Sequence, residues 1–69
     1  MLEYFKTVLA KVSFDKGLFE KELWKALKNL MLNEVRELKK WCYKKFGKKH
    51  QEIIERCFAK FNKQLNLSV

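Results

Sequence analysis

Residues 15–47 read DKGLFEKELWKALKNLMLNEVRELKKWCYKKFG, and this stretch decides the fold. Asp15 is a good first residue for a helix, because its carboxylate can accept hydrogen bonds from the free backbone N–H groups of the first turn. At the other end, Lys44 and Lys45 lie in the last turn, and Gly47 can take the left-handed conformation that closes a helix. The chain contains no proline that would break the helix between them. The stretch therefore predicts one long central helix over about residues 16–46.

The predicted central helix is long for so small a protein. Roughly 31 residues at ~1.5 Å each make a rod of about 46 Å. A compact chain of 69 residues has a diameter of about 28 Å. Either the helix bends or breaks near its middle, or another chain covers part of it. Because 48% of the residues are apolar, which a small monomer cannot easily bury, we expect dimerisation.

Shorter helices are predicted on both sides of the central one. Apolar residues three and four apart predict a short N-terminal helix: Leu2, Phe5, Val8, Leu9 and Val12. The same spacing predicts a C-terminal helix over about residues 50–65: Ile53, Ile54, Cys57, Phe58, Phe61 and Leu65. The connection at residues 47–49 is short, so this last helix should fold back antiparallel. We therefore predict a single all-α domain over residues 1–69, of the helical-bundle type, completed by dimerisation.

One broad apolar face of the central helix is the predicted interface between two copies. Its residues are Leu23, Leu27, Leu30, Met31, Glu34, Leu38 and Trp41. Glu34 lies in the middle of this face with no basic residue three or four positions away, and a buried carboxylate without a partner is costly. Glu34 therefore either reaches water at the edge of the interface or forms an intermolecular contact that sets the dimer register.

A lysine cluster lies near the end of the central helix, in a chain of net charge +8. The cluster consists of Lys39, Lys40, Lys44, Lys45, Lys48 and Lys49, interleaved with aromatic residues. Such charge favours an anionic partner, either nucleic acid or an acidic protein. The alternative is a solvated helix end whose charges complement the helix dipole.

Three potential metal ligands come together if the chain folds back near residue 48. Cys42, His50 and Cys57 are soft ligands, but zinc requires a fourth, and no closely spaced cysteine pair is present. We therefore expect packing roles for these residues, with no metal or cofactor. No nucleophile stands beside a base and no Gly-rich loop is present, so we expect no catalytic residues and no enzyme.

The sequence also bears on location and function. Its longest apolar run, residues 30–32, is far short of the ~18 residues that span a bilayer, and the N-terminus lacks a signal sequence, so we expect a cytoplasmic protein. The first hypothesis is a non-enzymatic, self-associating protein-interaction module. The alternative is a small basic nucleic-acid-binding protein that uses its lysine-rich face. Nucleic-acid binding would weaken steeply with salt, whereas apolar self-association would not.

Overall fold

Three α-helices build the fold in the computed structural model, which describes the backbone of residues 1–67 and the side chains of residues 1–64. They are α1 (Leu2–Val12), α2 (Lys16–Asn29) and α3 (Leu32–Leu67). α3 is kinked at His50, whose backbone angles, φ −125° and ψ 27°, are not helical. The described part of the chain contains no strand, so the prediction of an all-α protein is confirmed.

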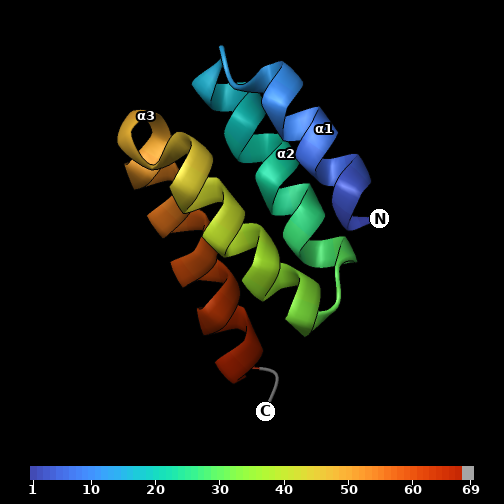
Figure 1. Cartoon of the computed structure of the whole chain (residues 1–69). Coiled ribbons are helices and arrows are strands. Elements are labelled where there is room, and N and C mark those ends of the chain that lie inside the picture. Colours follow the sequence, from blue (N-terminus) through green and yellow to red (C-terminus); the bar gives the residue numbers. More distant parts are fainter. Residues whose placement is uncertain (68–69) are drawn as a thin grey trace.

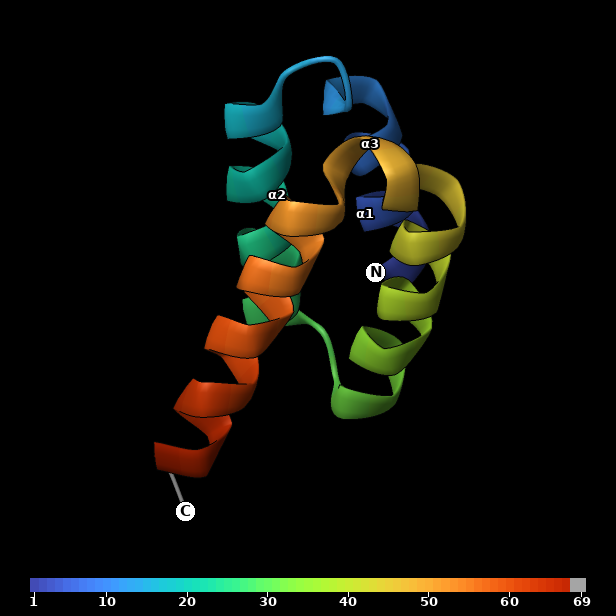
Figure 2. The same cartoon turned by 90° about the vertical axis from the view of Figure 1, so that its left-hand side faces the viewer.

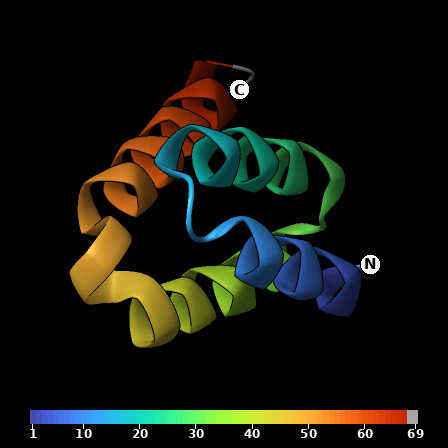
Figure 3. The same cartoon turned by 90° about the horizontal axis from the view of Figure 1, so that it is seen from above.

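The chain reverses direction three times: between α1 and α2, between α2 and α3, and at the kink of α3 (Figures 1 and 2). Seen from above, α1, α2 and the two halves of α3, residues 32–49 and 51–67, surround a common interior (Figure 3). A single apolar core draws on all four segments. Its buried members are Phe5, Leu9, Phe19, Leu23, Ala26, Leu27, Val35, Leu38, Cys42, Phe46, Ile53, Ile54, Cys57 and Phe58.

The predicted start of the central helix is confirmed in detail. Asp15 has an extended backbone, with φ −123° and ψ 113°, and its side chain accepts a hydrogen bond from the Leu18 N–H at 3.1 Å. A short polar side chain in this position satisfies one of the backbone donors that every helix start leaves unpaired. The cap therefore fixes the point at which the chain turns from α1 into α2.

The prediction of one continuous helix over residues 16–46 is wrong. α2 ends at Asn29, Leu30 is extended with φ −97° and ψ 155°, and α3 begins at Leu32. The physical reason is burial. A straight rod would leave half of its apolar face uncovered, whereas the break folds α2 and residues 32–49 toward the same core. The gain from burying both apolar faces outweighs the loss of the backbone hydrogen bonds that residues 31–34 would donate within a continuous helix.

Glu34 lowers the free-energy cost of the break between α2 and α3. Its Oε1 atom accepts a hydrogen bond from the Met31 backbone N–H at 3.2 Å, and the Met31 carbonyl accepts one from the Val35 N–H at 2.8 Å. A glutamate in the third position of a helix that reaches back to the residue before it forms one half of a capping box. Glu34 is half-buried and acts within its own chain, which explains a carboxylate on an otherwise apolar face.

Gly47 does not end a helix, contrary to the prediction. No described glycine has a positive φ, and helix continues through residues 47–49 to the kink at His50. The chain still folds back, three residues later than expected. The kink lies where it brings the His50 ring into the core, onto the face of Phe19.

The broken helix fits a small body. The radius of gyration is 11.2 Å and the principal extents are 35 × 23 × 19 Å. A rod of about 46 Å would have overshot these dimensions. The length of the central helix therefore no longer argues for cover by a second chain.

We expect Glu34→Ala to lower the free energy of unfolding by about 0.5–1 kcal/mol, because the start of α3 loses its side-chain acceptor. Urea denaturation at pH 7 measures the change. Glu37→Ala, which removes an exposed carboxylate from the same helix, is the matched control. Equal stabilities of the two variants would contradict the capping role. A change in oligomeric state caused by Glu34→Ala alone would contradict it too.

Candidate anion-binding surface

Four basic side chains form a row that winds over the outer face of α3, each about 40° further around the axis than the last. Arg36, Lys40, Lys44 and Lys48 are spaced four residues apart and all are exposed. Residues at this spacing lie on one side of a helix, about 6 Å apart along its axis. We call these four residues the basic ridge. It runs for about 18 Å along the helix axis. The sequence between Glu37 and Glu52 contains no acidic residue.

The six lysines predicted as a patch are all exposed, but they do not form one surface. Three of them belong to the basic ridge. Lys39 and Lys45 turn to opposite flanks, with the Lys39 Nζ 5.8 Å from the Phe58 ring centre and the Lys45 Nζ 5.7 Å from that of Trp41. Lys49 lies at the kink. The prediction omitted Arg36, although its position four residues before Lys40 could have identified it.

Trp41 forms an aromatic edge to this surface, in a groove between α1 and α3. It is half-buried, and the Lys6 Nζ of α1 lies 5.9 Å from its ring centre, in addition to Lys45. Lys11 lines the same groove. Ammonium groups at this distance from an indole ring are attracted by its electrons. Glu3 lines the groove too and pairs with Lys6 at 3.4 Å, so among the described residues Lys11 and Lys45 are the groove's unpaired cations.

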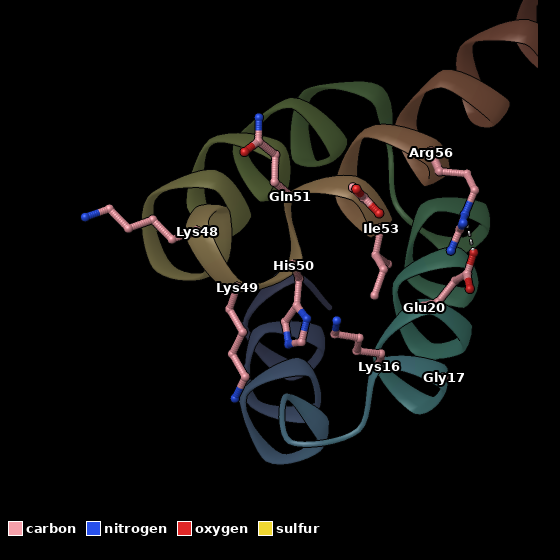
Figure 4. A pocket seen from close by; sticks show the side chains of 10 residues that line it. Lys16, Gly17, Glu20, Lys48, Lys49, His50, Gln51, Ile53 and Arg56 are labelled. Carbon is pink, nitrogen blue, oxygen red and sulfur yellow. Dashed lines mark hydrogen bonds and ion pairs between the residues drawn. The ribbon is translucent and has the colours of Figure 1, made fainter.

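A pocket opens at the kink of α3, against the first turn of α2 (Figure 4). Its lining includes Lys16 and Gly17 of α2 and Lys49, His50 and Arg56 of α3. The His50 side chain is held firmly. Its Nε2 lies 2.7 Å from the Ser13 carbonyl oxygen, and because a carbonyl only accepts, Nε2 carries the proton.

The predicted interface residues are divided by the fold. Leu23, Leu27 and Leu38 are buried in the core of their own chain, so they cannot also cover a second copy. Leu30 and Trp41 are half-buried against that core, and Glu34 caps α3. Only Met31 of this set is an exposed apolar residue, with 72% of its surface accessible. The set therefore does not form a continuous interface, because most of its apolar surface is already buried.

The two cysteines are buried and free. Burial raises the pKa of the Cys42 thiol to about 12, and repulsion from Cys57 adds to the effect. Burial likewise raises the pKa of Cys57 to about 11, with a further contribution from Glu20. Both side chains are therefore neutral thiols at physiological pH, in which form they pack as small apolar groups. Within the described residues, no three histidine, cysteine or acidic side chains are grouped so as to hold a metal ion.

Comparisons with known proteins add no relative: no protein-family model, curated protein or solved structure matches the chain. Among the helices that the structure describes, none combines the length and apolar character needed to cross a bilayer. We therefore infer function from the geometry and charge of the exposed surface of α3 and of the pocket at its kink.

We expect both thiols to react slowly with a disulfide reagent at pH 8 in the folded protein and rapidly in urea. Their raised pKa values keep them protonated and their burial blocks access. The raised values also mean that their contribution to stability is complete below about pH 8.5, the usual thiol pKa, and is lost as the pH rises through about 11 to 12. Spectrophotometric thiol titration measures the rates. Rapid labelling of either cysteine without denaturant would show that the core around the kink opens readily.

Proposed function

We propose that the protein is a non-enzymatic nucleic-acid-binding protein that contacts the phosphate backbone through the basic ridge. The observation that carries the proposal is the regular row of Arg36, Lys40, Lys44 and Lys48 on a segment that lacks acidic residues between Glu37 and Glu52. A row of evenly spaced cations suits a polymer with a repeating negative charge better than it suits an acidic protein, whose carboxylates are irregularly placed.

The chemistry of the ridge favours binding without sequence preference. Three of its four members are lysines, which act on phosphate as point charges and do not read base edges as paired arginine contacts do. Trp41 and Tyr43 are half-buried beside the ridge and offer limited aromatic surface to unpaired bases. We therefore propose single-stranded nucleic acid as the ligand, held mainly by its backbone.

The remaining reactive side chains support a binding role without catalysis. The single histidine of the chain donates its Nε2 proton to the Ser13 carbonyl and stacks on Phe19. Both thiols are buried and protonated. The histidine and the two thiols thus have packing roles in the described structure, whereas the lysines project into solvent.

The affinity for a single-stranded oligonucleotide should fall steeply with salt, with a log–log slope of about −3 for four phosphate contacts. Reversing two ridge charges, with Lys40→Glu and Lys44→Glu, should weaken binding at low salt by at least about tenfold and reduce the slope by about half. Fluorescence anisotropy at several salt concentrations measures both quantities.

The matched control reverses Lys21 and Lys25, two exposed lysines four residues apart on α2. It changes the net charge by the same amount, and it should retain most of the wild-type affinity. If both pairs of substitutions weaken binding equally, the attraction depends on total charge and the ridge has no special role. If the wild-type protein does not bind an oligonucleotide at low salt, the proposed function is wrong.

Self-association is a second candidate, but through a different surface from the predicted one. The connection between α2 and α3 exposes two successive apolar side chains: Met31 is 72% and Leu32 53% accessible. Together with the half-buried Leu30 they form an apolar corner that a second copy would cover. This corner lies at the end of the molecule opposite the kink (Figure 2).

Met31→Ser with Leu32→Glu tests this corner without damaging the helix. Serine is a favourable residue before a helix and glutamate is favourable in its first turn. If the corner joins two copies, sedimentation at micromolar concentration should give about twice the 8.4 kDa chain mass for the wild type and a monomer for the variant. A wild-type protein that remains monomeric would exclude dimerisation by this route.

A further inference from the structure

The pocket at the kink contains a buried nitrogen atom without a partner. The His50 side chain is part of the lining, and the residue is only 2% exposed. Its Nε2 atom is bound to the Ser13 carbonyl, while its Nδ1 atom is buried and makes no hydrogen bond. An unpaired buried polar atom costs free energy, so a ligand that supplied a partner would recover part of that cost.

Basic residues line the pocket around His50. In Figure 4 the His50 ring lies between the side chains of Lys16 and Lys49. Lys48 and Arg56 complete a set of four basic residues in the lining, against two carboxylates, Glu20 and Glu52. One of these carboxylates is already engaged, since Arg56 Nε donates to Glu20 Oε2 at 2.9 Å.

The backbone at the pocket adds to the positive potential. Lys16 and Gly17 occupy the first two positions of α2, a helix of 14 residues. The N–H groups at these positions have no acceptor within the helix, and the helix dipole places partial positive charge there. Asp15 binds the N–H of the next residue, Leu18, and leaves those two donors without a side-chain acceptor in the described structure, while its carboxylate, which lies beside Gly17, offsets part of the positive charge of the helix start. Helix starts of this kind are favourable sites for phosphate.

We propose that this pocket binds a phosphate monoester, and that the phosphorylated end of a strand lying on the basic ridge supplies it. The second half of the proposal rests on the proposed function, because Lys48 belongs both to the ridge and to the lining of the pocket. A strand that follows the ridge toward the kink therefore reaches the pocket at its end.

The chemistry of the pocket selects a monoester over an internal diester. A terminal phosphate carries a charge of about −1.5 to −2 and has three acceptor oxygens, which two lysines and two backbone donors can share. Its singly protonated form has a P–OH group that donates to a bare imidazole nitrogen, and its dianion accepts from a protonated one. Either form gives His50 Nδ1 the partner it lacks. Lys16 and Lys49 are exposed, so their side chains can adjust to a ligand beside the ring.

The first experiment uses inorganic phosphate and the single histidine of the chain. Long-range ¹H–¹⁵N spectra resolve the two imidazole nitrogens, and phosphate is added at constant pH and ionic strength against chloride. A saturable shift of Nδ1 should occur by about 20 mM phosphate, where a site with millimolar Kd is largely filled. Lys16→Met with Lys49→Met should abolish the shift, whereas the control Lys25→Met, on the exposed side of α2, should preserve it.

The second experiment identifies the source of the phosphate. Two oligonucleotides of one sequence, with a 5′-phosphate or a 5′-hydroxyl, are compared by anisotropy. The phosphorylated strand should bind about tenfold more tightly, as expected for one or two added charge-assisted hydrogen bonds. Lys16→Met with Lys49→Met should reduce that ratio to one. The ratio is the diagnostic quantity, because losing Lys49 also weakens both strands through general charge.

The outcomes separate the two proposals. If the strands bind equally while phosphate shifts Nδ1, the pocket is a phosphate site whose ligand is a small molecule, and the strand-end assignment is overturned. If phosphate causes no saturable shift and the strands bind equally, the pocket proposal fails while the ridge proposal stands. If neither strand binds but phosphate shifts Nδ1, the ridge proposal fails and the pocket remains a phosphate site.

Discussion

The contact of His50 with the turn between α1 and α2 is the constraint on which the rest of the structure depends. The imidazole donates to the Ser13 carbonyl at 2.7 Å and stacks on Phe19 at a centre-to-centre distance of 4.5 Å. Phe46, one turn earlier in α3, packs edge-on against the same Phe19 ring at 5.2 Å. One side chain thus joins the end of α1, the start of α2 and the kink of α3, and it fixes where the last segment turns back.

This constraint also arranges the charged surface. Because α3 reverses at His50, residues 32–49 present one face to the core and the opposite face to solvent, with Val35, Leu38 and Cys42 buried inside. The outer face is where the basic ridge lies. The same kink carries Lys49 next to the first turn of α2 and so creates the pocket. The proposed ligand surface is therefore a consequence of how the chain closes its core.

The sequence predicted the parts of the fold that depend on local chemistry. Asp15 was identified as a helix cap from its side chain alone, and the apolar spacing in α1 and in residues 51–64 was sufficient to predict helix. A break near the middle of the central helix was one of two alternatives that its length left open, but its position after Asn29 was not predicted, since apolar spacing continues across it and no glycine or proline marks it. Glu34 is a helix-start signal if a new helix begins two residues before it, because glutamate is favoured at the third helical position. On a continuous helix the same residue is only an unexplained charge on an apolar face.

At the candidate site, too, the sequence predicted local properties but not which residues come together in space. Exposure of the six predicted lysines follows from their charge and needed no structure. The assignment of Leu23, Leu27 and Leu38 to an intermolecular interface failed because sequence periodicity says that a face is covered without saying by what. The pocket at the kink could not be foreseen, because it joins residues more than thirty positions apart and depends on the orientation of one imidazole ring.

The charge pattern of α3 is more than folding requires. The core is satisfied by the inner residues of the helix whichever charges stand outside, and like charges four residues apart destabilise a helix by a few tenths of a kcal/mol for each pair. Arg36, Lys40, Lys44 and Lys48 contain three such pairs in succession. Alternating charges would allow the chain to fold at least as well, so folding does not explain the row of like charges. Binding to an anionic partner, as proposed above, would explain it. A polyanion on the ridge removes this repulsion, and binding that favours the folded state then also stabilises it.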